Sequence, residues 1–298
     1  MRVGFVGIGN MGRPMAANLA QGGHELIVAD LSREAVESFT GEFDNARPAN
    51  GLAALAQDSD AVITIVPNGK DVRKIALGAD GGDNLADGMA EGSLLIDMSS
   101  SAPTGTVELG AEMAERGIAM VDAPVSGGVP RAIDGTLAIM VGGDAADIER
   151  CRPLLEVMGG QIFETGKLGS GHALKCLNNV MSGTHLILAA EALLIGKKFG
   201  IGSETMVDVL NFSSGKNSAT EGKMNRYILN RAFNSGFSMA LMMKDIDTAL
   251  DLAKEMEVGW LIGGLVRNIY RAARNQLPDD ADNAEVVKWL EANAGIEL

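Results

Sequence analysis

The chain has 298 residues, and 46% of them are hydrophobic, so it can bury one large core or two smaller ones. Its 39 acidic and 25 basic side chains give a net charge of −14 at pH 7, which repels phosphate backbones and argues against a nucleic-acid partner. The start of the chain does not resemble a signal peptide, and no uncharged apolar run is long enough for a membrane span, so we expect a soluble, cytoplasmic protein.

A short apolar strand is predicted at residues 1–7, and it runs into a glycine-rich turn before a helix that begins near Pro14. In the pattern GxGxxG the first glycine permits the tight turn, the second lets a pyrophosphate approach the backbone, and the third lets helix and strand pack closely. The helix N-terminus attracts the anion. The expected cofactor-binding residues of this turn are Gly7, Gly9, Asn10, Met11 and Gly12.

A second strand is expected at residues 25–30, and it ends in Asp30, 18 positions after Gly12. A carboxylate at this point can accept hydrogen bonds from the ribose hydroxyls of an adenosine and repels a 2′-phosphate, so it favours NAD over NADP. Arg33 is the counter-argument, because it could turn inward to meet a phosphate. Asp30 could also be a helix cap or a surface acid.

Strands and helices alternate along the following part of the chain, which predicts a parallel, doubly wound sheet of the Rossmann type. Ligands of such sheets bind at the carboxyl ends of the strands, where we expect Val66, Pro67 and Ser100 to line the dinucleotide groove unless they are plain loop. The expected strands are residues 61–67, 93–99, 119–125 and 137–141, with helices at 72–77 and 146–157.

Ser126, Gly127 and Gly128 follow the strand at residues 119–125. Glycines after a strand expose backbone amides, and a serine adds a hydroxyl, so the three residues can form a nest for a small carboxylate. A plain turn would have a similar sequence.

A helix of about 28 residues is predicted from near Gly171 to Lys198. Lys175 and Asn179 lie four residues apart and project from the same side of it. In a cleft, the lysine could transfer a proton and the amide could hold a hydroxyl or carboxylate; on a solvated face, the pair is an ordinary polar stripe. Cys176 is a buried hydrophobic residue or a reactive thiol, and the cysteines and histidines of the chain form no metal-binding pattern.

The rest of the chain lacks strand signals, so we expect a long interdomain helix and an all-helical second domain, with the boundary between residues 1–165 and 166–298. Lys244 is expected near the start of a helix at residues 242–256, where a cation is unfavourable beside the helix dipole unless an anion compensates it. This placement favours a role at the cofactor. Lys216 and Asn217 lie in a polar segment that is either a surface loop or a second substrate contact.

Four motifs occur in a characteristic order: GxGxMGxxMAxNL at residues 7–19, Asp-Ala-Pro-Val-Ser-Gly-Gly at 122–128, GxxGxGxxxKxxxN at 166–179, and Lys244-Asp245. With them the sequence resembles the β-hydroxyacid dehydrogenase family, the group of 3-hydroxyisobutyrate dehydrogenase and tartronate semialdehyde reductase. The resemblance covers nearly the whole chain. One departure is Ile246-Asp247, where the family usually has leucine and glycine after the Lys-Asp pair.

The resemblance implies that Lys175 is the catalytic lysine, that Asn179 and the segment 126–128 hold the substrate, that Lys244 approaches the cofactor, and that Ser100 lies beside the nicotinamide. It also implies a homodimer or homotetramer. We expect NAD-dependent oxidation of a small β-hydroxy acid, similar to 3-hydroxyisobutyrate, with Lys175 as general acid and base. The alternatives are an NADPH-dependent semialdehyde reductase and a module that senses the dinucleotide without chemistry.

Overall fold

The computed structural model describes residues 1–79 and 81–298, whose contacts divide into two compact units, Met1–Lys175 and Cys176–Leu298. The division falls inside helix α8 (Ser170–Phe199), ten residues after the expected boundary at residue 165. The difference arises because the first turn of α8 is bonded to the first unit, where the carboxylate of Asp122 accepts the backbone N–H of His172.

The first unit contains a nine-stranded sheet in the part of the chain that the structure describes, with the strand order β3-β2-β1-β4-β5-β6-β8-β7 and with β9 paired to β8. The pairs from β3 to β6 are parallel, whereas β8 runs antiparallel to β6 and β7. This is the predicted doubly wound, Rossmann-type sheet. The strands are β1 (Arg2–Val6), β2 (Glu25–Ala29), β3 (Ala46–Pro48), β4 (Ala61–Thr64), β5 (Leu94–Asp97), β6 (Ala119–Asp122), β7 (Val125–Ser126), β8 (Leu137–Gly142) and β9 (Gly159–Gly166).

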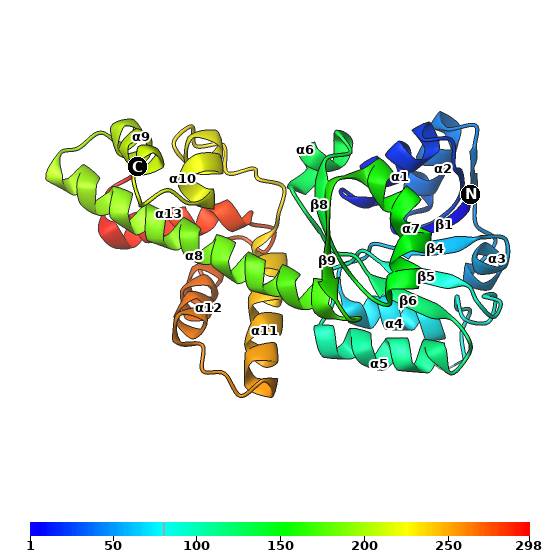
Figure 1. Cartoon of the computed structure of the whole chain (residues 1–298). Helices are drawn as coiled ribbons and strands as arrows, with labels where there is room; N and C mark the ends of the chain where they lie inside the picture. Colours follow the sequence, from blue (N-terminus) through cyan, green and yellow to red (C-terminus); the bar gives the residue numbers. More distant parts are fainter. Residues whose placement is uncertain (80) are drawn as a thin grey trace. The chain divides into compact units, whose positions relative to one another are not determined.

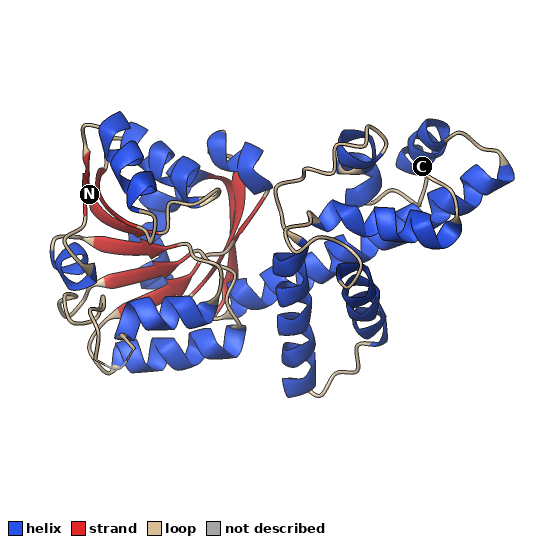
Figure 2. Cartoon of the chain, turned by 180° about the vertical axis from the view of Figure 1, so that it is seen from behind, coloured by secondary structure: helices blue, strands red, loops and turns tan. Residues whose placement is uncertain are grey.

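Helices cover both faces of the sheet (Figures 1 and 2), and a separate apolar core fills each side. Successive strand residues point to opposite faces, so Val3 and Phe5 of β1 pack in one core and Val6 in the other. The first core includes side chains of α1 (Gly12–Gln21), α2 (Arg33–Glu42) and α7 (Ala145–Met158), and the second those of α3 (Leu52–Gln57), α4 (Gly69–Leu77) and α5 (Pro103–Ala114). The short helix α6 (Gly128–Ile133) follows β7.

All the secondary-structure elements of the second unit are helices, as predicted, and the unit has its own apolar core. Side chains of α8 such as Val180, Leu186 and Leu193 contribute to this core. The other elements are α9 (Ser203–Phe212), α10 (Ser218–Gly222), the π-helix η1 (Met224–Ile228), α11 (Met239–Glu255), α12 (Leu261–Arg274), the 3₁₀-helix η2 (Asn283–Glu285) and α13 (Val286–Ala294).

Among the described residues, α8 alone has the length and mean hydropathy that a membrane-spanning helix needs. Half of its apolar window is buried inside the protein, and Cys176 through Leu194 contribute repeatedly to the core of the second unit. The helix therefore serves as a core element of the second unit.

Candidate active site

The glycine turn between β1 and α1 depends on two positions that exclude a side chain. Gly7 has a φ of +99°, and a Cβ there would lie 2.2 Å from the carbonyl oxygen of Ile65. A Cβ on Gly12 would lie 1.9 Å from the carbonyl oxygen of Gly7. A Cβ on Gly9 would meet no heavy atom within 4 Å, so this glycine borders open space, as the approach of a pyrophosphate requires.

The backbone amides of the turn lie at the start of α1. This helix begins at Gly12, with Met11 as its N-cap, and Asn10 precedes the cap. The first amides of a helix have no carbonyl partner within the helix, and they form the positive end of its dipole. The predicted residues of the turn therefore fit a dinucleotide phosphate.

Asp30 lies immediately after β2 and is bonded to the glycine turn. Its carboxylate accepts the backbone N–H of Ile8 at 2.8 Å and that of Ser32 at 2.8 Å. The cap of α2 is Ser32, whose hydroxyl accepts the N–H of Ala35 at 3.2 Å, so Asp30 is not the helix cap. Arg33 is highly exposed and pairs with Glu37 at 2.8 Å along the same helix.

The residues expected along the dinucleotide groove follow β4 and β5. Val66 is partly buried, and its N–H donates to the hydroxyl of Ser99 at 3.0 Å, which joins the ends of the two strands. Ser100 is partly buried as well, whereas Pro67 is exposed. All three residues thus lie at the carboxyl end of the parallel sheet, where such folds bind ligands.

A buried carboxylate holds the loop after β5. Asp97 accepts hydrogen bonds from the hydroxyl of Thr64 at 3.1 Å, the N–H of Ser99 at 3.0 Å and the hydroxyl of Ser101 at 2.8 Å. All four residues are at most 4% exposed. Because buried polar groups are costly unless they are hydrogen-bonded, this network fixes the loop that carries Ser100.

The first turn of α8 is anchored to the sheet by Asp122 and His172. The carboxylate of Asp122 accepts the N–H groups of Gly169 and His172, both at 2.7 Å. The imidazole Nε2 donates to the carbonyl of Ser99 at 3.2 Å, and Nδ1 lies 2.9 Å from the hydroxyl of Thr106. Burial raises the pKa of Asp122, while His172 and these two backbone donors act in the opposite direction.

The predicted carboxylate nest lies between β7 and α6. Gly127 and Gly128 have φ values of +136° and +70°, which side chains rarely adopt, and both are exposed. Ser126 is partly buried at the end of β7. The three residues therefore present small groups and accessible backbone at this turn.

Lys175 and Asn179 lie on α8, one turn apart. Lys175 is partly buried, and Asn179 is 7% exposed. The amide nitrogen of Asn179 donates to the carboxylate of Asp245 on α11 at 2.5 Å. Since a carboxylate can only accept, this bond fixes the orientation of the amide. The Oδ1 atom accepts a hydrogen bond from Nδ2 of Asn178 at 3.4 Å.

Lys244 is not at the start of a helix, contrary to the prediction. Helix α11 begins at Met239, after the N-cap Ser238, so Lys244 is its sixth residue and lies beyond the reach of the unfavourable dipole. Its ammonium group lies 3.0 Å from the carboxylate of Asp245. The compensating anion is therefore the next residue in the sequence.

Neither cysteine has the properties of a reactive thiol. Cys151 and Cys176 are buried, and burial raises the pKa of each to about 12. Thiols react as thiolates, so the buried interpretation of Cys176 is supported. Among the described residues, no cluster of three or more His, Cys, Asp or Glu side chains could hold a metal ion.

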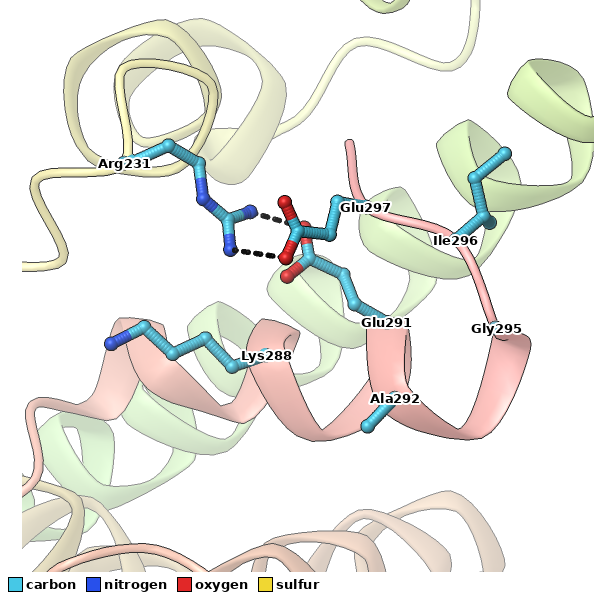
Figure 3. A pocket seen from close by; sticks show the side chains of 7 residues that line it. All are labelled: Arg231, Lys288, Glu291, Ala292, Gly295, Ile296 and Glu297. Atoms are coloured by element: carbon cyan, nitrogen blue, oxygen red, sulfur yellow. Dashed lines mark hydrogen bonds and ion pairs between the residues drawn. The ribbon is translucent and has the colours of Figure 1, made fainter.

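A hollow of about 430 Å³ lies at the C-terminal end of the second unit, and none of the predicted site residues lines it. Arg231 and the carboxylates of Glu291 and Glu297 form ion pairs across it (Figure 3). Lys288 pairs with Glu285 at 2.7 Å. The cations of this hollow are thus already neutralised by acids of the same unit.

Known proteins resemble the chain over both units. The NAD-binding domain family of 6-phosphogluconate dehydrogenase matches residues 2–166, and the family described as NAD-binding of NADP-dependent 3-hydroxyisobutyrate dehydrogenase matches residues 169–290. The 2-(hydroxymethyl)glutarate dehydrogenase of Eubacterium barkeri is 36% identical, over 100% of this chain and 97% of that protein. The 3-sulfolactaldehyde reductase of Escherichia coli is 34% identical, over 99% of this chain and 97% of that protein.

A solved structure of 3-hydroxyisobutyrate dehydrogenase from Mycobacterium tuberculosis with L-serine has a TM-score of 0.88 and 31% identity, and the match covers 97% of this chain and 98% of that one. Relatives that match almost end to end are dehydrogenases and reductases, which excludes the module that only senses a dinucleotide. The chain therefore belongs to the β-hydroxyacid dehydrogenase family and is an NAD(P)-dependent oxidoreductase.

Proposed function

We propose that the protein oxidises a small β-hydroxy acid to the semialdehyde or keto acid with NAD, and that Lys175 is the general acid and base. The observation that carries the proposal is on α8, where a partly buried lysine lies one turn before an amide whose orientation is fixed by Asp245. A solvated polar stripe would not need a buried carboxylate to orient its amide.

Oxidation of an alcohol removes a hydride from carbon and a proton from oxygen, and the nicotinamide, when bound, would supply the hydride acceptor. Lys175 takes the proton from the substrate hydroxyl. Asn179, whose Nδ2 is bonded to Asp245, holds the substrate from the next turn of α8. Ser126 and the backbone of Gly127 and Gly128 hold the substrate carboxylate.

The preference for NAD rests on Asp30. Its two backbone bonds fix the carboxylate beside the glycine turn, where it meets the ribose of the adenosine. Arg33 was the residue that could have favoured a 2′-phosphate, but it is exposed and pairs with Glu37. We also propose that Lys244 contacts the cofactor.

The names of three related dehydrogenases support a common substrate class. 2-(Hydroxymethyl)glutarate, 3-hydroxyisobutyrate and L-serine each carry a primary hydroxyl on the carbon next to the one that bears the carboxylate. The alternative is an NADPH-dependent reductase that converts an aldehyde to an alcohol. The 3-sulfolactaldehyde reductase among the relatives supports this alternative. Initial rates with each cofactor in each direction distinguish the two. We further propose a cytoplasmic homo-oligomer.

The test compares wild type with Lys175→Ala on these three hydroxy acids by absorbance at 340 nm. General acid–base catalysis contributes about 10²- to 10⁴-fold, so we expect turnover to fall by that factor while NADH affinity, measured by fluorescence titration, stays within a few-fold. Lys167→Ala, at an exposed lysine before α8, is the matched control and should retain full activity. Full turnover without Lys175, or joint loss of turnover and NADH binding, would contradict the assigned role.

A further inference from the structure

Lys223 is a second lysine that contacts α8. It lies at the junction of α10 and the π-helix η1, and its ammonium group is 3.0 Å from the hydroxyl of Ser182. The side chain is partly buried, and burial lowers the pKa of Lys223. Among residues 1–79 and 81–298, no carboxylate forms an ion pair with this ammonium group within 4.0 Å.

The acids near Lys223 already have other partners. Glu221 lies 2.8 Å from the ammonium of Lys216. Asp282 raises the pKa of Lys223 as a lesser influence than burial, but it forms no ion pair with Lys223; its Oδ1 accepts hydrogen bonds from Ser235 and Ala284, and its Oδ2 accepts one from Gly236. A partly buried cation without a paired acid is costly, so its neighbourhood suits an anion that comes from outside the chain.

The position of Ser182 relates this cation to the proposed catalytic lysine. Ser182 follows Lys175 by seven residues on α8, which is two turns, or about 10 Å along the axis, and places both on the same side of the helix. Asn179 lies between them. The polar side of α8 thus extends from Lys175 to Ser182, and Ser182 is hydrogen-bonded to the ammonium group of Lys223.

The backbone that carries Lys223 is held firmly. The hydroxyl of Ser218, at the start of α10, lies 3.0 Å from Nδ1 of His185 on α8. Met224 and Ile228 of the π-helix are fully buried in the core. The widened turns of π-helices occur frequently at functional sites, and here the widened segment begins directly after Lys223.

We propose that Lys223 and Ser182 bind a second anionic group of the substrate, on the carbon chain away from the reacting hydroxyl. The preferred substrate is therefore a β-hydroxy acid with a further carboxylate, or a chemically similar anion, at its far end. This inference rests on the proposed function, because it uses Lys175 as the point at which the hydroxyl reacts. The ammonium of Lys223 and the hydroxyl of Ser182 both donate to the distal oxygens.

The kinetic test uses the full-length protein with NAD and compares 2-(hydroxymethyl)glutarate, which has two carboxylates, with 3-hydroxyisobutyrate, which has one. Hydrogen bonds to charged groups correspond to roughly 10- to 100-fold in affinity. We expect Lys223→Met to raise KM for the diacid by this factor with kcat nearly unchanged, and to leave the monoacid within about threefold. Lys223→Arg should restore part of the preference, and Lys254→Met is the control at an exposed lysine near the end of α11.

Equal losses on both substrates, or a wild-type enzyme that prefers the monoacid, would overturn the subsite and leave the proposed function standing. If wild type turns over no hydroxy acid, the proposed function fails, and a binding measurement decides the subsite by itself. In calorimetric titrations, glutarate should bind wild type more tightly than Lys223→Met, and butyrate should not distinguish them. Glutarate binding that is unaffected by Lys223→Met would refute the assignment.

Discussion

At the scale of single residues, Asp30 supports the glycine turn through backbone hydrogen bonds, and we propose that it also binds the ribose of the cofactor. Each of its carboxylate oxygens accepts one backbone N–H, from Ile8 or Ser32, at 2.8 Å. A carboxylate oxygen can accept more than one hydrogen bond, so both retain capacity for the hydroxyls of a ribose. The same charge would repel a phosphate on that ribose.

Replacement of Asp30 by alanine should therefore change cofactor choice as well as affinity. We expect Asp30→Ala to weaken NAD binding by roughly tenfold, because hydrogen bonds to a charged acceptor are lost, and to improve kcat/KM with NADP relative to NAD. The measurement is kcat/KM with each cofactor. Glu34→Ala, at an exposed acid in the first turn of α2, should change neither value. An unchanged NAD to NADP ratio would mean that Asp30 only supports the turn.

Asp30 was predictable because its position follows from local sequence order, at the end of a strand that follows the glycine turn. The roles of His172, Asp97 and Asp245 were not. His172 lies 73 residues from Ser99, whose carbonyl it bonds, and Asp245 lies 66 residues from Asn179. Only the folded chain brings such groups together. The adjacency of Asp245 to Lys244 was the one signal that could have indicated a compensating acid.

At the scale of secondary structure, the start of α8 is fixed by Asp122 at the end of β6. Both carboxylate oxygens accept backbone N–H groups of the segment that leads into the helix, and the side chain is fully buried. An error in this anchor would shift the first turn of the helix, on which Lys175 follows His172 by three residues.

Asp122→Asn replaces one acceptor oxygen by a donor that must face a backbone N–H. The unsatisfied pair should reduce the free energy of unfolding by about 1–3 kcal/mol, and displacement of Lys175 should lower kcat more than it changes NADH affinity. Urea denaturation and steady-state kinetics measure the two effects. Asp134→Asn, at an exposed residue after α6, is the control. Wild-type stability and kcat in Asp122→Asn would show that the anchor is dispensable.

The main strands and helices could be predicted because their apolar residues repeat with the period of the structure. Three strands escaped prediction. The predicted strand at residues 119–125 is in fact two, β6 and β7, which both pair with β8. The residues of β9 are half-buried or exposed throughout, so they lack an apolar alternation, and this strand is defined only by its pairing with β8. The third, β3, has three residues and ends in Pro48. Likewise, α11 begins three residues before the predicted start because Ser238 caps it.

At the scale of the whole molecule, an apolar stripe on α8 supports the predicted homo-oligomer. Leu174, Met181, Leu188 and Ile195 recur every seven residues, and they are 44%, 56%, 59% and 71% exposed. Seven residues bring side chains back to the same side of a helix, and helices associate through such heptad stripes. Contiguous exposed apolar surface of this kind marks interaction sites.

We expect the double substitution Leu188→Lys and Ile195→Lys to reduce the molar mass in solution from that of a dimer or tetramer to that of a smaller species. Introduced charges would have to be buried without partners in the interface. Light scattering after size exclusion measures the mass. Ile133→Lys, at an apolar residue of α6 that is 60% exposed, should leave it unchanged. A wild-type monomer would exclude this role of the stripe.

The burial of both cysteine thiols makes the protein convenient for site-directed labelling. Because Cys151 and Cys176 are buried and protonated at neutral pH, they should not react with a maleimide dye in the native state. Cysteines engineered at one exposed position in each unit would then accept a donor and an acceptor fluorophore without removal of native residues. Energy transfer between the dyes would report whether the separation of the units changes when dinucleotide and hydroxy acid are added.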